Sequence, residues 1–228
     1  MAASVAVSED GALIAQSYQR SGLTHSRTLM PMCRDLLENC GLTLGEMDVV
    51  AVAAGPGSFT GLRIGVATAK GLAWPGDKPC AGVSTLEAMA WPLAHLEGDL
   101  CAVMDARRHQ VYNARFQAEE GQLLRLCPDR AISIDELAAE LLSREKTQIL
   151  VGDGAELCYN ELTKRGLPVR LAPPHLRWQS AWGVARAAEE LARTGGLVTA
   201  AELAPVYHRL SQAERERLAR QQAAADDR

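Results

Sequence analysis

Residues 55–63 read Gly55-Pro56-Gly57-Ser58-Phe59-Thr60-Gly61-Leu62-Arg63 and join an apolar run to a segment with helical spacing. The run before them, residues 49–54, consists of β-branched and small residues, which is typical of a strand buried on both faces. After them, apolar side chains recur at intervals of three or four residues as far as Ala73. The sequence therefore predicts a strand, a tight turn and a helix, with Ser58 or Thr60 as the N-cap.

The glycines of this turn allow two interpretations. Gly55 and Gly57 permit unusual backbone angles and close approaches, and a turn of this kind can hold an anion at the helix N-terminus. A P-loop is excluded because no lysine follows the last glycine, and a dinucleotide fingerprint is excluded because Thr60 stands where it needs glycine. We therefore keep Gly55, Gly57 and Ser58 as a candidate anion or nucleotide loop, beside the alternative of a turn that only packs the helix on the sheet.

The predicted helix has many small residues on its surface. Gly65 and Gly71 lie within it, although a glycine inside a helix costs about 1 kcal/mol relative to alanine. Such a surface lets another element approach the backbone closely. That element is either the chain's own sheet, which we place first, or a helix of a partner.

The composition indicates a globular protein of one domain or two small lobes. The chain has 228 residues, of which 47% are hydrophobic and 23% charged, and its net charge of −4 gives it no electrostatic footprint for binding nucleic acid alone. A basic leader or an apolar stretch of about 20 residues is absent, so we expect a cytoplasmic protein outside the membrane. The six cysteines form no CxxC pair, which favours free thiols over a zinc site or a disulfide frame.

Local patterns predict the other elements. A hairpin is expected over residues 3–18, a helix over 24–40, a strand at 80–83 and a helix from residue 84 or 85. Beyond a polar lobe boundary at 96–99, we expect strands at 100–104, 123–126 and 148–151, a hairpin through 105–112, and helices at 134–142 and 180–194. The tryptophans, namely Trp74, Trp91, Trp178 and Trp182, are expected in the core.

Several of these stretches resemble the TsaB (YeaZ) family. The resemblance rests on residues 55–73 with Pro79-Cys80-Ala81-Gly82-Val83-Ser84-Thr85-Leu86-Glu87-Ala88-Met89-Ala90, on Asp105-Ala106-Arg107 with Val111-Tyr112, and on Pro205-Val206-Tyr207-His208-Arg209. Members of this family are the non-catalytic partners in bacterial synthesis of threonylcarbamoyladenosine in tRNA. The resemblance implies an α/β, actin-like ATPase or ribonuclease H-like (ASKHA) fold, in which two lobes each hold a mixed sheet flanked by helices.

On this resemblance, residues 1–97 form an N-terminal actin-like lobe with partner-binding helices, residues 98–210 form a C-terminal lobe, and residues 211–228 form a charged tail. Chains of the family normally begin one strand earlier, and we expect that strand to be missing here through a start codon assigned too late. In ATP-binding members of the fold, a glycine turn like that of Gly152 and Gly154 touches the nucleotide. These two glycines join the candidate nucleotide loop.

The third helix lacks the metal ligands of the catalytic relative, which carries His-x-x-x-His at its start. Aligned through Val83 and Leu86-Glu87, the two histidines fall on Thr85 and Met89, which supply no imidazole. We therefore expect no catalytic residue and no metal site in this chain, and we expect ATP and a metal ion in its partner subunits. Asp105 and Arg107 are expected to form an ion pair within their turn.

The resemblance also implies the partners. The chain is expected to dimerise with a TsaD-type catalytic paralogue, to recruit a TsaE-type ATPase, to contact tRNA through the complex, and to form a homodimer when alone. The residues expected at the interface are Leu29, Cys33, Leu36, Leu37, Gly61, Leu62, Gly65, Val66 and Ala69. The expected function is a scaffold or activator for N6-threonylcarbamoylation of the adenosine beside the anticodon. The alternative is an independent enzyme, either a metal-dependent glycoprotease-like hydrolase or an actin-like kinase.

Overall fold

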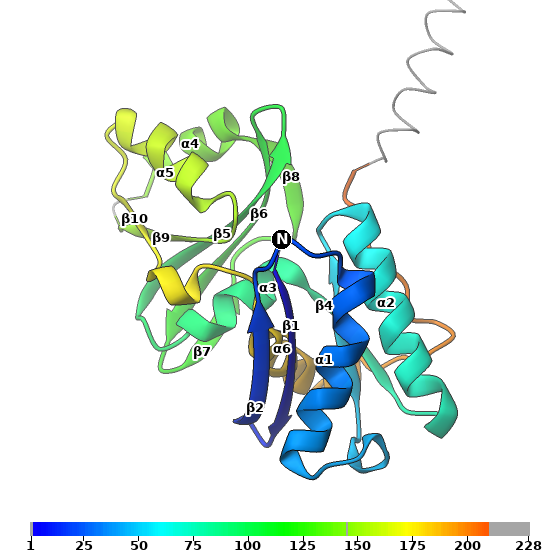
Figure 1. Cartoon of the computed structure of the whole chain (residues 1–228). Coiled ribbons are helices and arrows are strands. Elements are labelled where there is room, and N and C mark those ends of the chain that lie inside the picture. Colours follow the sequence, from blue (N-terminus) through cyan, green and yellow to red (C-terminus); the bar gives the residue numbers. More distant parts are fainter. Residues whose placement is uncertain (1, 145, 210–228) are drawn as a thin grey trace, which may run out of the picture.

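The computed structural model describes residues 2–144 and 146–209 and has two lobes with helix α3 packed between them (Figure 1). The first lobe contains β1 (Ala3–Glu9), β2 (Ala12–Gln19), α1 (His25–Cys40), β3 (Val50–Gly55), α2 (Phe59–Ala73), β4 (Cys80–Ser84) and α3 (Thr85–Ala90). The second contains β5 (Gly98–Arg107), β6 (Gln110–Glu119), β7 (Gln122–Arg125), β8 (Arg130–Ser133), α4 (Ile134–Leu142), β9 (Gln148–Val151), α5 (Ala155–Lys164) and β10 (Val169–Leu171). Helix α6 (Ala181–Arg193) follows, and the predicted charged tail lies outside the described residues.

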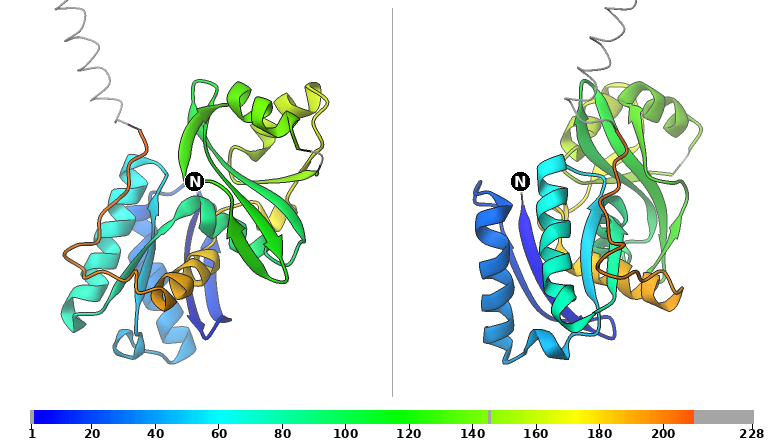
Figure 2. Two further views of the ribbon diagram at one scale, coloured as in Figure 1. Left: turned by 180° about the vertical axis from the view of Figure 1, so that it is seen from behind. Right: turned by 90° about the vertical axis from the view of Figure 1, so that its right-hand side faces the viewer.

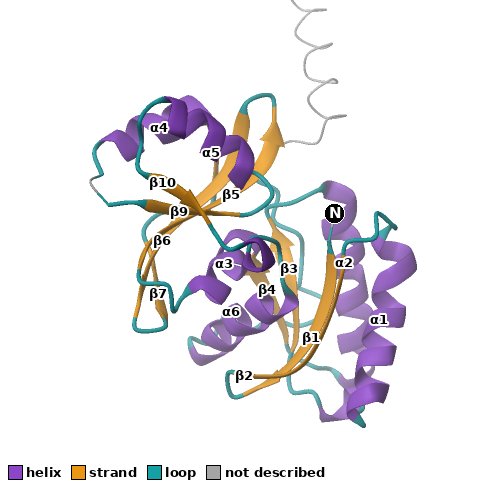
Figure 3. Ribbon diagram, turned by 60° about the vertical axis from the view of Figure 1, so that its left-hand side comes forward, coloured by secondary structure: helices purple, strands orange, loops and turns teal. Residues whose placement is uncertain are grey.

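The strands of the first lobe form two separate pairs. β1 runs antiparallel to β2, and β3 runs parallel to β4, but no pairing joins β1 to β3 in the part of the chain that the structure describes. The single mixed sheet expected for this lobe is therefore divided. Helices α1 and α2 lie on one side of the strands and α6 on the other (Figure 3), and α6 contacts β1, β3 and β4. Helix packing thus joins the two pairs.

The second lobe has the expected mixed sheet, with strand order β10-β9-β5-β6-β7 and with β8 paired to β6. One face of this sheet packs on α4 and α5 through buried residues such as Val103, Leu137 and Leu162. The other face packs on α3, where Leu86 and Met89 are completely buried in the same apolar cluster as Phe116 of β6. Because α3 belongs in sequence to the first lobe, the two lobes share a continuous core.

Helices α3 and α6 cross with almost no space between them. An ideal Cβ placed on Gly183 of α6 would lie 1.9 Å from the carbonyl oxygen of Ala88 in α3. Only glycine, which has no Cβ, lets the backbone of α6 come this close to the backbone of α3. The contact fixes α6 against the helix that both lobes share.

After α6 the chain returns to the first lobe (Figure 2). Val198 forms an isolated antiparallel bridge with Cys80, and the Val206 N–H donates to the Ala54 carbonyl at 2.8 Å. Arg209 then donates to the carbonyl oxygen of Ala106 in β5. We call residues 204–209 the C-terminal strap. Within the region predicted as the C-terminal lobe, α6 and this strap therefore contact the first lobe as well.

Most of the predicted elements are confirmed within one to three residues at their ends. The structure adds β8, α5 and β10, which the sequence analysis did not predict. The placement of every tryptophan in the core is wrong for Trp74, which is 69% exposed just after α2, whereas Trp91 is 4% exposed. The reason is that Trp74 comes directly after Ala73, the last buried residue of α2, and therefore lies on the side of the helix that faces away from the sheet.

Candidate partner-binding site

Helices α1 and α2 pack side by side and present one surface of the first lobe (Figure 2). Helix α1 ends at Gly41, whose left-handed backbone (φ 65°) lets its N–H reach the Glu38 carbonyl. Helix α2 begins at Ser58, whose hydroxyl accepts a hydrogen bond from the Gly61 N–H at 3.0 Å, as predicted. Both helices therefore have defined ends that fix the surface they share.

Four of the nine residues expected at the partner interface lie in the chain's own core. These are Leu36, Leu62, Val66 and Ala69, each at most 9% exposed. The reason is that the apolar stripe of a surface helix packs against the sheet beneath it. Leu29, Cys33, Leu37, Gly61 and Gly65 are partly exposed.

The outward surface of the two helices consists mainly of other residues. Met30 is 49% exposed, Ala67 is exposed, and a Cβ on Gly71 would meet no atom within 4 Å. A Cβ on Gly65 would instead meet Val52 of β3 at 3.4 Å. Close packing on the chain's own sheet, the alternative that we placed first, is confirmed at Gly65, whereas a partner helix at Gly71 stays a prediction. We define the α1–α2 face as Met30, Cys33, Leu37, Ala67, Thr68 and Gly71.

The candidate anion loop at the start of α2 is covered by the C-terminal strap. A Cβ on Gly55, where φ is 150°, would lie 2.2 Å from the Val206 carbonyl oxygen. The rings of Phe59 and Tyr207 stack with centroids 4.5 Å apart, and the Arg63 Nε donates to the Tyr207 hydroxyl at 3.1 Å. Packing of the strap therefore accounts for glycine at position 55.

The second glycine turn uses its own donors internally. A Cβ on Gly152, where φ is 112°, would lie 2.1 Å from the Val103 carbonyl oxygen. The Gly152 N–H donates to the Arg177 carbonyl at 2.9 Å, and the Gly154 N–H donates to the Val103 carbonyl at 3.2 Å. These two N–H groups are therefore already used and are not free to bind an anion. Nucleotide binding by either loop stays a prediction.

The start of α3 is joined to the second lobe by a polar cluster. The Ser84 hydroxyl donates to Asp129 at 2.6 Å, and Arg125 contacts Asp129 at 2.7 Å and Glu87 at 2.6 Å. Arg125 therefore bridges the two carboxylates across the boundary between the lobes. Across residues 2–144 and 146–209, no three His, Cys, Asp or Glu side chains are grouped so that they could hold a metal ion.

Thr85 and Met89, the positions where the resemblance would place the metal-binding histidines of the catalytic relative, face the interior. Thr85 is 5% exposed, and Met89 is completely buried against the sheet of the second lobe. These positions support the shared core.

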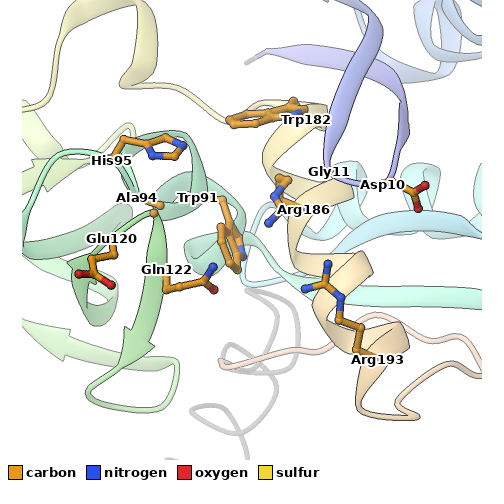
Figure 4. Close-up of a pocket in the computed structure, with 11 residues that line it drawn as sticks. Asp10, Gly11, Trp91, Ala94, His95, Glu120, Gln122, Trp182, Arg186 and Arg193 are labelled. Carbon is orange, nitrogen blue, oxygen red and sulfur yellow. The ribbon is translucent and has the colours of Figure 1, made fainter.

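A pocket of about 350 Å³ lies between the lobes on the side of α6 (Figure 4). Its walls include Asp10, Trp91, Glu120, Trp182 and Arg186. The Arg186 guanidinium lies 5.0 Å from the centre of the Trp91 ring and forms an ion pair with Glu189. The sequence analysis missed this pocket because its walls come from four segments that are far apart in the chain.

The cysteines are free thiols, and Cys80, Cys101 and Cys158 are buried. Burial raises the pKa of Cys101 to about 12 and also raises the pKa of Cys158. These two thiols are therefore protonated and unreactive at neutral pH. Among the described residues, no helix is both long and apolar enough to cross a membrane.

Comparison with known proteins places these features in a family. Residues 19–160 match the family model described as TsaD, tRNA N6-adenosine threonylcarbamoyltransferase. The chain is similar to the tRNA threonylcarbamoyladenosine biosynthesis protein TsaB of Bacillus subtilis, with 33% identity over 153 residues and 67% of each chain covered. It is also similar to TsaB of Escherichia coli, with 34% identity over 156 residues and again 67% of each chain covered.

The fold agrees with a solved structure from the same group. YeaZ from Pseudomonas aeruginosa superimposes with a TM-score of 0.74 at 28% identity, and the match covers 90% of this chain and 94% of that one. This agreement confirms the predicted ASKHA-like α/β fold. The chain belongs to the TsaB (YeaZ) family of tRNA threonylcarbamoyladenosine biosynthesis proteins.

Proposed function

We propose that the chain is the scaffold and activator subunit of a cytoplasmic assembly that transfers threonylcarbamoyl to the adenosine beside the anticodon of tRNA. In this proposal the chain dimerises with a TsaD-type catalytic paralogue and recruits a TsaE-type ATPase, and these partners bind the metal ion and ATP. When no paralogue is present, the same face pairs two copies of the chain. The names of the relatives, which refer to tRNA threonylcarbamoyladenosine biosynthesis, support the pathway.

The observation that carries the dimerisation is the α1–α2 face. It combines exposed Met30 with the small residues Ala67 and Gly71 on two adjacent helices. Small side chains let helices of another subunit approach closely, and an exposed methionine adapts its shape to an apolar partner. The core residues Leu62 and Val66 hold this surface in place from beneath.

The residues at the start of α3 support a role without catalysis by this chain. Glu87 and Asp129 each form an ion pair with Arg125, and Met89 fills the core between the lobes. The net charge of −4 supports contact with tRNA through the assembly. The hydrolase or kinase alternative requires metal or phosphate ligands that these side chains do not supply.

The test is size-exclusion chromatography with light scattering on the chain mixed with the catalytic paralogue of the same organism. Ala67→Glu introduces a charge on the α1–α2 face, and Ala139→Glu introduces the same charge at an exposed position of α4. We expect the unchanged chain and Ala139→Glu to form the mixed species and to support threonylcarbamoylation of tRNA, and we expect Ala67→Glu to lose both. Equal complex formation by the two variants would contradict the proposed interface.

A further inference from the structure

The β5–β6 hairpin ends in three consecutive residues with left-handed backbone, Arg107, Arg108 and His109. Their φ angles are 65°, 56° and 59°, and all three residues are exposed. We call these residues the hairpin tip. Figure 1 shows it as the green turn at the top of the second lobe, beside α4. Left-handed backbone is unfavourable for residues that carry a Cβ, so three in a row are unusual.

Two other hairpins of the chain form their turns with glycine in the second position. The β1–β2 turn uses Asp10 and Gly11, with φ angles of 48° and 83°, and the β6–β7 turn uses Glu120 and Gly121, with φ angles of 50° and 76°. This is the usual chemistry of a two-residue turn with positive φ at both positions. The hairpin tip has Arg and His in the same geometry, so the stability of the turn does not explain these residues. Strained backbone of this kind is typical of functional sites.

The hairpin tip is positively charged although the chain as a whole is negative. Among the described residues, the side chains of Arg107 and Arg108 have no hydrogen bond or ion pair. The predicted ion pair between Asp105 and Arg107 is absent, because the Asp105 carboxylate accepts from the Arg107 backbone N–H at 2.7 Å. Of the nearby acidic side chains, Asp135 is paired with Arg165 and Glu161 with Lys164, whereas Asp105 and its neighbour Asp153 form no ion pair among the described residues. The two guanidinium groups therefore have no direct ion pair in the described part of the chain.

The backbone of the hairpin tip is anchored on both sides. Arg209 of the C-terminal strap donates to the Ala106 carbonyl before it, and the Ile134 N–H donates to the His109 carbonyl at its end at 3.2 Å. The guanidinium groups thus project from a backbone that is already ordered. A partner bound there does not have to order the turn, which favours affinity.

We propose that the hairpin tip binds the phosphate backbone of the tRNA on which the assembly acts. This inference rests on the proposed function and adds a contact made by this chain itself. Guanidinium groups match phosphate oxygens in a bidentate geometry, and two exposed arginines on consecutive residues offer two such groups at one turn. Because these contacts go to phosphates, the hairpin tip positions the tRNA and does not read its sequence.

The test is binding of unmodified tRNA to the complex of this chain with its catalytic paralogue, measured by fluorescence anisotropy at several salt concentrations. The variant is Arg107→Ala with Arg108→Ala, and the matched control is Arg144→Ala with Arg170→Ala, two exposed arginines elsewhere on the second lobe. Each phosphate contact contributes about 0.9 to the slope of log affinity against log salt. Loss of two contacts therefore lowers the slope by about 1.8. Between 50 and 200 mM salt, the total loss of affinity should then be about 12-fold smaller for the hairpin variant than for the unchanged complex.

Light scattering on the same samples separates the possible results. The proposal is supported if both double variants form the complex and only the hairpin variant loses tRNA affinity and salt slope. It is overturned if the hairpin variant binds tRNA with the unchanged slope. It is also overturned if that variant loses the protein complex instead, because the arginines would then belong to a protein interface. Failure of the unchanged chain to form any complex would refute the proposed function, and this inference with it.

Discussion

Two substitutions of glycine by alanine should change stability in opposite directions, although both lie in helices. In α6, a Cβ on Gly183 would lie 1.9 Å from the Ala88 carbonyl oxygen, whereas in α2 a Cβ on Gly71 would meet no atom within 4 Å. The added methyl group is the same in both variants. The difference between the two variants in the free energy of unfolding therefore measures the cost of disturbing the close contact between α3 and α6.

The magnitudes follow from these distances. Real Cβ atoms essentially never approach another heavy atom closer than 3.0 Å, so α3 and α6 have to separate by about 1.1 Å in Gly183→Ala. Overpacking of this kind costs about 1–3 kcal/mol, and a clash with rigid backbone belongs at the upper end. The higher helix propensity of alanine offsets up to about 1 kcal/mol of this cost, so Gly183→Ala should be about 2 kcal/mol less stable than the unchanged chain. Gly71→Ala gains the propensity term alone and should be about 1 kcal/mol more stable.

The assay is thermal and urea unfolding of the three chains, followed by circular dichroism. For a chain of this size each kcal/mol shifts the Tm by about 2–4 °C, so the two variants should differ by about 6–12 °C. The reasoning is refuted if Gly183→Ala is as stable as the unchanged chain, or if both variants shift in the same direction. A normal Gly71→Ala with an insoluble Gly183→Ala would agree with the prediction.

The other predictions concern single side chains. The Arg130 guanidinium holds the pKa of Glu140 below its usual value. This pair therefore stabilises the fold above the unfolded pKa of about 4.3, and the stabilisation is lost as pH falls through the lower folded pKa. Because the Glu140 side chain is 37% exposed and screened by solvent, Glu140→Gln should cost about 0.5–1 kcal/mol at pH 7 in urea titrations, and a constant difference down to pH 3 would contradict this. Thiol labelling of the native chain should leave Cys80, Cys101 and Cys158 unmodified until denaturant is added, and rapid labelling of all six cysteines would disprove their burial. His109→Gly should raise stability by about 1 kcal/mol because glycine tolerates the left-handed backbone, and a lower Tm would argue against the strain.

The elements with strong sequence patterns could be predicted. The run at 49–54, the helix stop at Gly41 and the capping residue Ser58 each act through neighbours in sequence, and the structure places them as expected. Strands β8 and β10 are only four and three residues long, so alternation has too few positions to appear. Helix α5 was missed although its buried residues, Ala155, Cys158 and Leu162, follow a helical period.

The α1–α2 face, where we propose that the partner binds, was harder to predict for a physical reason. Apolar periodicity marks the side of a helix that leaves water, and in a folded subunit this side packs first against the chain's own sheet. Leu62 and Val66 therefore stood out in the sequence and are buried. The surface left for a partner consists of small and partly polar residues such as Ala67 and Gly71, which carry no periodic signal of their own. The same limit applies to the hairpin tip, whose strain is visible only in its backbone angles.

The connection between the lobes suits a subunit that positions others. Helix α3 is part of both cores, Gly183 lets α6 lie directly on it, and Arg125 links Glu87 of α3 to Asp129 of the second lobe. Opening the lobes would expose fully buried Leu86 and Met89, and burial of each such side chain contributes about 1.5–3 kcal/mol. The α1–α2 face on the first lobe and the hairpin tip on the second are thus held at a fixed separation. In the proposed assembly, a catalytic subunit bound at the first and a tRNA bound at the second would be aligned by the rigid core between them.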